Sequence, residues 1–382
     1  MLKISKSIMF SYLLGIFTLA ASSVQPVAAA DLDYGKPGEP VNLVVGYQPY
    51  YTESWSGVVI NGKQLWKKYL PPGSTVEFQV GLQGAIIVNQ MLAGKQHIGY
   101  MGDMPAIVAT TKRDVADIRM VANIGLSRDQ CNILLARNDA PAFKTQEEAI
   151  KWMDGKVVAA PKGSCSDRFA QEMFKKYNVK PEAYLNQSIE VITSGFRVGK
   201  LDAAIIWEPT ASRIVQEKLA RRVASGNAVG EDDGAFLDMR YDLIRQRPDV
   251  VKAWLKAEIE AEKFLADPKN ADEVVAMVKQ QTTGFPEEAL RTALYGPYPE
   301  SVGGSVTRVV LPAAFTDTAY QLLSKATAFL YDIKSINVDK LLPDAILPNY
   351  VQQAMTEMKV TAPVGTVRIP GAPAADAPKA KK

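Results

Sequence analysis

Two segments about a hundred residues apart carry nearly the same pattern. Residues 94–105 read GKQHIGYMGDMP and residues 199–209 read GKLDAAIIWEP. Each begins with Gly-Lys, continues through a short apolar run typical of a strand, and ends with an acidic residue close to a proline. The glycine follows a helical pattern in both segments, as expected of a helix C-cap. The repeat predicts two similar α/β lobes with a cleft at their strand ends, where ligands bind in open α/β sheets.

Strand-like and helix-like segments alternate from residue 41 onward. Residues 41–45 and 98–101 read as buried strands, and residues 76–80 alternate apolar and polar side chains with period two. A strand over 118–124 closes this first unit, and a second unit repeats the alternation from residue 131. The order is typical of an α/β fold.

After about residue 225 the chain becomes mainly helical in period. A strand near residues 236–238 is expected to return the chain to the first lobe. Residues 361–382 are rich in Ala, Pro, Gly and Lys and lack the apolar content to pack, so disorder is expected there. Helices are predicted over 249–265, 271–280, 287–295, 313–331 and 349–358.

Residues 1–30 have the composition of a secretory signal peptide. Lys3 and Lys6 precede an apolar run, and the segment ends in small residues before a cleavage site predicted after Ala30. No later stretch approaches the roughly 18 consecutive apolar residues of a membrane helix, so a soluble periplasmic protein is predicted. The expected organisation is 1–30 signal peptide, 31–126 first part of lobe 1, 127–225 lobe 2, 226–360 return to lobe 1 with C-terminal helices, and 361–382 tail.

Charge and composition exclude one class of partner. Loss of the signal removes two lysines and no acidic residue, so the formal net charge falls from +3 to +1. A near-neutral chain gives no electrostatic case for nucleic acid. With 47% hydrophobic residues the composition is that of a globular protein, and the length suits two domains.

Cys131 and Cys165 are the only cysteines. In an exported protein both would meet an oxidising compartment, where thiols pair, so one disulfide is predicted. The alternative is a pair of buried, unlinked cysteines, because free cysteine packs as a small apolar residue.

Catalytic patterns are scarce. His97 is the only histidine and falls at the start of a predicted strand, which favours a structural role. The sequence has no His-x-x-x-His pair, no Gly-x-Ser-x-Gly elbow and no phosphate loop. We therefore predict no enzyme, no catalytic residues, no metal and no cofactor.

Two glycine-bearing turns favour ligand binding instead. Residues 81–84 and 163–166 each follow a strand and open a helix, so each offers unpaired N–H groups and the positive end of a helix dipole to an anion. Ser164 and Ser166 add hydroxyl groups to the second turn. The alternative is that Ser166 or Asp167 only caps its helix.

Aromatic residues gather in the loop after the first strand, and others end the second repeat. Residues 47–55 hold four aromatic rings, of which Tyr51 and Trp55 are candidate walls of a small-molecule site. Packing against the lobe is the alternative for Tyr51. Trp207 and Glu208 are expected to reach into the cleft, although a tryptophan at a strand end is core equally often.

Arg128 lies between the two predicted units, on the hinge side. Its guanidinium could bind a carboxylate or sulfonate in bidentate fashion. An ion pair with Asp129 or another acid is an equal alternative.

The pattern resembles the nitrate, sulfonate and taurine type of solute-binding protein that serves ABC importers. The likeness runs from about residue 41 to residue 266, and the order and spacing of its motifs carry it, since no single motif is specific. The matching phrases are Gly46-Tyr47-Gln48, residues 91–95, Gly99 with residues 102–105, Lys162-Gly163-Ser164, and residues 199–204 with Glu208-Pro209.

The resemblance implies a two-lobed periplasmic binding protein fold of type II with a helical C-terminal extension. It also implies cleft closure on the ligand, delivery to a membrane permease and its ATPase, and a monomer. Carried over position by position, it points to the ligand-binding residues Gln48, Gly84, Asp103, Met104, Ser164 and Ser166.

Two departures from the family pattern bear on the ligand. His97 stands where relatives usually carry Asp, and the aromatic loop 47–55 looks unlike that of small-anion binders. The ligand expected is therefore an organic anion, a sulfonate or an aromatic or aliphatic carboxylate. The same superfamily includes proteins that bind or make a thiamine pyrimidine precursor, which is the alternative function. A third alternative, a partner-recruiting tail, rests on Lys379, Lys381 and Lys382.

Overall fold

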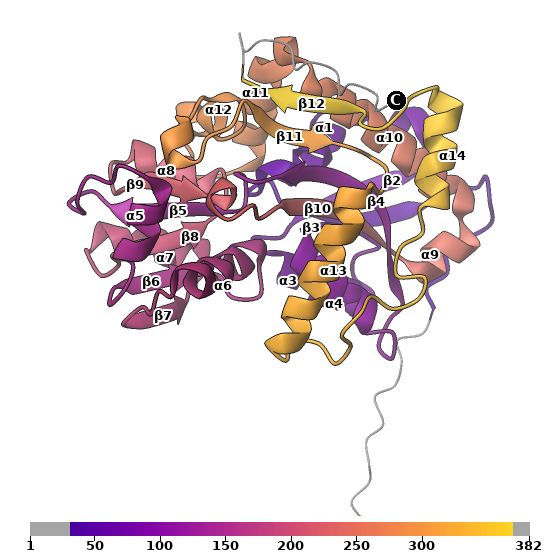
Figure 1. The fold of residues 1–382 in the computed structure, drawn as a ribbon. Coiled ribbons are helices and arrows are strands. Elements are labelled where there is room, and N and C mark those ends of the chain that lie inside the picture. The colour runs from indigo at the N-terminus through magenta and orange to yellow at the C-terminus, as the bar shows by residue number, and fades with distance from the viewer. Residues whose placement is uncertain (1–30, 370–382) are drawn as a thin grey trace, which may run out of the picture.

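The structure is a computed structural model that describes residues 31–369 (Figure 1). The predicted signal peptide and residues 370–382 lie outside this range. A seven-stranded sheet has the order β12-β11-β4-β10-β3-β1-β2, and a five-stranded sheet has the order β7-β6-β8-β5-β9. The strands are β1 Asn42–Tyr47, β2 Thr75–Val80, β3 Ile98–Gly102, β4 Ile118–Ser127, β5 Ile133–Arg137, β6 Val157–Ala160, β7 Ala183–Asn186, β8 Ala203–Ile206, β9 Ala220–Ser225, β10 Asp233–Arg240, β11 Thr307–Leu311 and β12 Gly365–Arg368.

Helices cover both faces of each sheet, which confirms the predicted two-lobed α/β fold. We use lobe 1 for the seven-stranded sheet with its helices and lobe 2 for the five-stranded sheet with its helices. The helices are α1 Trp55–Lys63, α2 Trp66–Tyr69, α3 Gly84–Leu92, α4 Asp103–Thr111, α5 Gln146–Trp152, α6 Cys165–Tyr177, α7 Ile189–Arg197, α8 Thr210–Gln216, α9 Tyr241–Gln246, α10 Pro248–Ala266, α11 Ala271–Gln281, α12 Glu287–Tyr295, α13 Asp317–Asp332 and α14 Asn349–Met358.

In lobe 1, β1 pairs in parallel with β2 and β3, while β10 runs antiparallel between β3 and β4. Helices α3, α4 and α13 pack on one face of the sheet. The other face packs on α1 and α10, where Trp55 and Trp254 are fully buried. The strand expected near residues 236–238 is β10, and it returns the chain to lobe 1 as predicted.

In lobe 2, successive residues of a strand enter different cores because side chains alternate across a sheet. Leu134 of β5 packs with α5 and α6, whereas its neighbours Ile133 and Leu135 pack with α7 and α8. That second core is continuous with lobe 1, since it also holds residues of α11 and α12. The C-terminal helices therefore join the two lobes.

The repeated motif occupies matching places in the two lobes. Gly94 and Gly199 follow α3 and α7 with φ of 70° and 68°, left-handed values that favour glycine, as predicted for helix ends. The apolar runs that follow them form β3 and β8, which lie inside their sheets. Both strands end at the boundary between the lobes.

The expected disordered tail is wrong for residues 365–368. This segment forms β12 at the edge of the large sheet, antiparallel to β11. Val367 is its one fully enclosed side chain, and the backbone pairing supplies the rest, so a search for apolar periodicity misses it.

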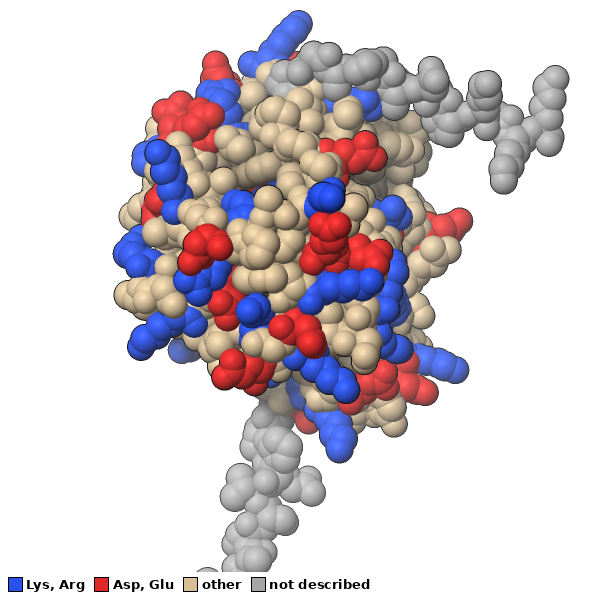
Figure 2. Space-filling view, turned by 60° about the vertical axis from the view of Figure 1, so that its left-hand side comes forward, with Lys and Arg blue, Asp and Glu red and all other residues tan. Residues whose placement is uncertain are grey.

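Surface charge is mixed. On the face shown in Figure 2, Lys and Arg side chains alternate with Asp and Glu side chains. None of the described helices is long and apolar enough to cross a membrane.

Candidate functional site

Two adjoining cavities lie between lobe 1 and lobe 2. The outer cavity has a volume of about 260 Å³ and the inner one about 40 Å³. Gly84 and Pro105 of lobe 1 and Ser164 and Trp207 of lobe 2 line both cavities, so these are two parts of one cleft. This is the place that the strand-end argument predicts.

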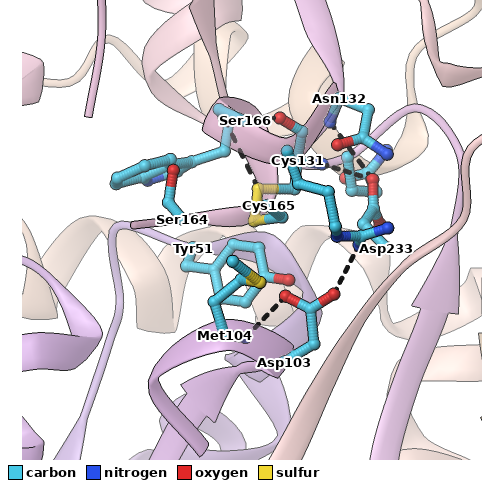
Figure 3. Close-up of a disulfide and its surroundings, with 12 residues drawn as sticks. Tyr51, Asp103, Met104, Cys131, Asn132, Ser164, Cys165, Ser166 and Asp233 are labelled. Atoms are coloured by element: carbon cyan, nitrogen blue, oxygen red, sulfur yellow. Dashed lines mark hydrogen bonds and ion pairs between the residues drawn. A yellow bond between two sulfur atoms is a disulfide. The ribbon is translucent and has the colours of Figure 1, made fainter. Parts of the chain in front are cut away.

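The inner cavity brings together several of the predicted ligand residues, with the two cysteines beside them (Figure 3). Gln48 Nε2 donates to the backbone oxygen of Tyr100 at 3.1 Å, which fixes the side chain at the end of β1. Trp207 Nε1 donates to the backbone oxygen of Tyr50 across the cleft at 3.0 Å. The predicted residues that line this cavity are Gln48, Tyr51, Gly84, Ser164 and Trp207.

The turn before α6 offers backbone donors. Ser164 is the N-cap: its Oγ accepts from the N–H of Asp167 and donates to the oxygen of Pro161 at 2.6 Å. Its hydroxyl is thereby used inside the turn. The N–H groups of Cys165 and Ser166 precede the first intrahelical bond, so they are the first-turn donors left for an acceptor in the cleft.

Gly84 opens α3 on the facing lobe. A Cβ at this position would overlap the ring of Pro105 in α4, so only glycine allows the two helix starts to approach this closely. Helices α3 and α6 thus direct their N-terminal ends at the same cleft from the two lobes, which favours a negatively charged ligand.

Asp103 and Met104 lie at the start of α4 but have protein partners. Asp103 is fully buried; its Oδ1 accepts from the N–H of Met104 at 2.7 Å, and its Oδ2 accepts from Arg168 at 2.6 Å. Burial raises the pKa of Asp103 and the guanidinium opposes this. Met104 packs in the core of lobe 1.

Arg168 is the main residue that the sequence analysis missed. It lies on α6 of lobe 2 and crosses to Asp103 of lobe 1, donates to the backbone oxygen of Asp232 at 3.0 Å, and pairs with Glu231. The guanidinium is almost fully buried. It therefore links lobe 2, lobe 1 and the second crossing segment, residues 226–232. Nothing in the helical pattern distinguishes it from an ordinary exposed arginine.

A second buried group lies behind Tyr51. Its hydroxyl donates to Glu53, which in turn contacts Asp233. Burial raises the pKa of Asp233 to about 6 and holds that of Glu53 well above its usual range. Asp233 also accepts from the N–H groups of Cys131 and Asn132 at 3.0 and 3.1 Å.

Lys162 belongs to the Lys162-Gly163-Ser164 phrase, and its position in the sequence does not by itself mark it as ligand-binding. It is the only charged residue among those lining the two cavities. Its side chain is exposed, with Nζ 4.7 Å from the centre of the Tyr184 ring. Lys162 is thus the cation available to a ligand in the outer cavity.

Besides Asp103 and Met104, the structure places four more predicted ligand residues away from the lining of these cavities. Trp55 is fully buried in the core of lobe 1, where its indole donates to the oxygen of Pro49 at 2.9 Å. Ser166 is buried too, and its Oγ donates to the oxygen of Cys131 at 2.8 Å.

The other two face a residue of opposite charge. Arg128 forms an ion pair with Asp232 and lines a separate cavity. This agrees with the alternative of an ion pair, although the acid is Asp232 rather than Asp129. Glu208 is buried near Arg222 and accepts from the N–H of Ser212 at 2.8 Å, and burial raises its pKa.

The predicted disulfide is confirmed: Cys131 and Cys165 are bonded, with Cα atoms 6.0 Å apart. His97 lies elsewhere, where Nδ1 accepts from the N–H of Val44 at 3.1 Å and the ring meets Tyr34 edge-on. Among the described residues no group of three or more His, Cys, Asp or Glu side chains could hold a metal ion.

Two α/β lobes with a cleft between them are the architecture of solute-binding proteins, and comparison with known proteins identifies the family. Residues 36–279 match the model of the NMT1-like family, so the chain belongs to that family. The taurine-binding periplasmic protein of Escherichia coli K12 is 25% identical over 256 residues, covering 65% of this chain and 75% of that protein.

Solved structures share the fold at low sequence identity. The alkanesulfonate-binding protein SsuA from Xanthomonas axonopodis pv. citri, bound to MOPS, has a TM-score of 0.64 at 18% identity and covers 82% of this chain and 99% of its own. The periplasmic nitrate-binding protein NrtA from Synechocystis PCC 6803 has a TM-score of 0.65 at 16% identity, covering 85% and 90%. The desulfurization enzyme DszB has a TM-score of 0.57 at 14% identity, covering 83% and 99%. The fold thus serves binding proteins and at least one enzyme.

Proposed function

We propose that this protein is the solute-binding component of an ABC importer, which captures a small organic anion in the periplasm and delivers it to a membrane permease and its ATPase. The observation that carries the proposal is the pair of helix N-termini, α3 of lobe 1 and α6 of lobe 2, at one cleft with Lys162 at its outer part. The taurine-binding relative supports the anion class.

Cavity size bears on the kind of anion. The inner cavity of about 40 Å³ is much smaller than the roughly 150 Å³ cavity that holds benzene in an engineered protein. A short aliphatic group therefore fits the inner cavity better than an aromatic ring, and the outer cavity of about 260 Å³ has room for the charged end of such a ligand beside Lys162. We infer an aliphatic sulfonate or carboxylate, with nitrate and a thiamine pyrimidine precursor as the comparison ligands.

Binding without catalysis is part of the proposal, although DszB shares the fold. Both cysteines are consumed in a disulfide, and His97 lines a cavity with Tyr34 rather than the cleft. We propose a monomer exported with loss of residues 1–30. Mass spectrometry of the periplasmic protein should then give an N-terminus at Asp31.

The test is a thermal-shift screen of residues 31–382, followed by calorimetric titration, with nitrate, ethanesulfonate, taurine, propionate, benzoate and a thiamine pyrimidine precursor. A ligand at a hundred times its dissociation constant adds about 2.7 kcal/mol to the free energy of unfolding. A saturable shift with an aliphatic sulfonate or carboxylate supports the proposal. Turnover of a ligand, or a response to the pyrimidine alone, would contradict it.

A further inference from the structure

The disulfide cross-links lobe 2 and also forms part of the wall of the cleft. Cys131 lies just before β5, in the first crossing segment, residues 128–132, and Cys165 is the first residue of α6. Both line the inner cavity together with Tyr51 and Gly102 of the opposite lobe. In Figure 3 the two sulfur atoms lie between the Ser164–Ser166 turn and Tyr51.

The disulfide also faces lobe 1 at close range. A Cβ built on Gly102, at the end of β3, would lie 3.9 Å from Cys165 Sγ and 3.9 Å from Cε1 of Tyr51. Cys131 is fully buried and Cys165 is 5% exposed. With the lobes together, the sulfur atoms are therefore enclosed by protein from both sides of the cleft.

Hydrogen bonds connect the residues of the disulfide to the chain segments that cross between the lobes. Asp233, which begins β10 after the second crossing segment, accepts from the N–H of Cys131 at 3.0 Å. Ser166 Oγ donates to the oxygen of Cys131 at 2.8 Å. The disulfide and these bonds together fix the first turn of α6, which carries the free N–H groups, relative to both crossing segments.

We propose that the Cys131–Cys165 disulfide is a positioning element of the ligand site, so that ligand binding and the oxidised state of the pair stabilise each other. This inference rests on the proposed function. Loss of the bond leaves the first turn of α6 held to the crossing segments by the Ser166 and Arg168 side chains and separates the two sulfur atoms of the cleft wall, and ligand affinity falls. Because coupling between two equilibria is reciprocal, the ligand must also shift the reduction equilibrium toward the disulfide. A ligand that occupies the inner cavity also covers the sulfur atoms that line it, so it slows the attack of a reducing thiol.

Reduction by dithiothreitol defines the chemistry of the test. One thiolate of the reagent attacks a protein sulfur, which forms a mixed disulfide and releases the other cysteine as a thiolate. The second thiol of the reagent then attacks the mixed disulfide and closes its own ring. The protein gains two electrons and two protons as two thiols, and the reagent leaves as a cyclic disulfide. The attack needs access to sulfur atoms that the closed lobes cover.

The experiment measures both sides of the coupling with the tightest binder among nitrate, ethanesulfonate, taurine, propionate and benzoate. Calorimetry compares its affinity for the oxidised protein, the reduced protein and the C131S/C165S variant, whose folding is checked by circular dichroism. Mass spectrometry after thiol alkylation gives the rate of reduction with and without saturating ligand. We expect at least tenfold weaker binding without the disulfide and at least tenfold slower reduction with ligand.

The outcomes distinguish the role of the disulfide in the ligand site from the proposed function. Affinity of the folded, reduced protein within twofold of the oxidised value overturns the inference and leaves the proposed function standing. If the reduced protein and the variant both fail to fold, the test uses the reduction rate of the wild-type protein. When saturating ligand leaves that rate unchanged, the inference is overturned. Failure of every anion to bind the oxidised protein overturns the proposed function, and the inference with it.

Discussion

Arg168 offers the sharpest test of how the two lobes are held together. We predict that R168M lowers the free energy of unfolding by about 3–5 kcal/mol at pH 8, the range for removing one partner of a buried ion pair. The estimate follows from the partners that remain. Glu231 keeps its ion pair with Lys325, whereas Asp103 is fully buried and loses the one ion-pair partner it has within residues 31–369. The cost therefore falls mainly on Asp103.

The pH dependence of the R168M effect and a double variant test whether the unpaired charge of Asp103 causes the loss of stability. Burial raises the pKa of Asp103 and Arg168 opposes the rise, so R168M should move this pKa further up. A carboxyl whose folded-state pKa lies above its unfolded value contributes stability at low pH that is lost as the pH rises through the folded pKa. The difference between R168M and wild type should therefore be smaller at pH 5 than at pH 8. In the double variant D103N/R168M, removal of the unpaired charge should recover part of the loss.

Urea unfolding at both pH values, followed by circular dichroism and tryptophan fluorescence, measures these differences. A loss below about 1 kcal/mol for R168M at pH 8 would show that the ion pair contributes little, as exposed pairs do. Equal losses at pH 5 and pH 8, together with no recovery in the double variant, would place the cost in lost side-chain packing rather than in the charge of Asp103.

Three further predictions concern the cleft and the core. K162Q should weaken anion binding about tenfold, a cost of about 1.4 kcal/mol, without changing the melting temperature of the free protein. Lys180 is an exposed lysine elsewhere on lobe 2, so the control variant K180Q should bind the anion normally in calorimetry. Gly84→Ala should reduce affinity and stability together, because its Cβ would overlap Pro105; unchanged thermal unfolding and calorimetry would contradict this. Burial raises the pKa of Glu258 to about 7, so the free energy of unfolding of the wild-type protein should fall as the pH rises through 7. In urea unfolding, E258Q should not show this decrease and should be more stable than wild type by up to about 3 kcal/mol at pH 8. Parallel pH profiles for the two proteins would refute the prediction.

Local patterns predicted the fold because they recur at regular spacing. The glycines at 94 and 199 end helices, and the apolar runs after them become β3 and β8. The same repeat located the cleft, since strand ends in two similar lobes meet at the boundary. Domain boundaries remain predictions, as do the roles of individual ligand residues.

Side-chain partners across the lobes could not be predicted, because they depend on how two distant segments approach. Arg168 lies 65 residues from Asp103 in the chain. In the sequence it stands beside Asp167 in a helix with a polar face, where an exposed arginine is the ordinary expectation. Trp55 shows the opposite error: a tryptophan in an aromatic loop suggested a ligand wall, but it begins α1, whose first turn faces the core.

Several buried ion pairs of this protein lie where the chain crosses between the lobes. Arg168 pairs with Glu231 at the second crossing, and Arg308 and Arg222 pair with Asp129 at the first. Desolvating such ions costs several kcal/mol each unless they are paired with good geometry, so any other placement of the lobes leaves charges unpaired or brings water to them. The pairs therefore act less as a source of stability than as a constraint on the relative position of the lobes. Because Arg168 lies on α6 and Asp129 lies two residues before Cys131, the position of the lobes that pairs these charges also sets where the first turn of α6 and the disulfide face lobe 1.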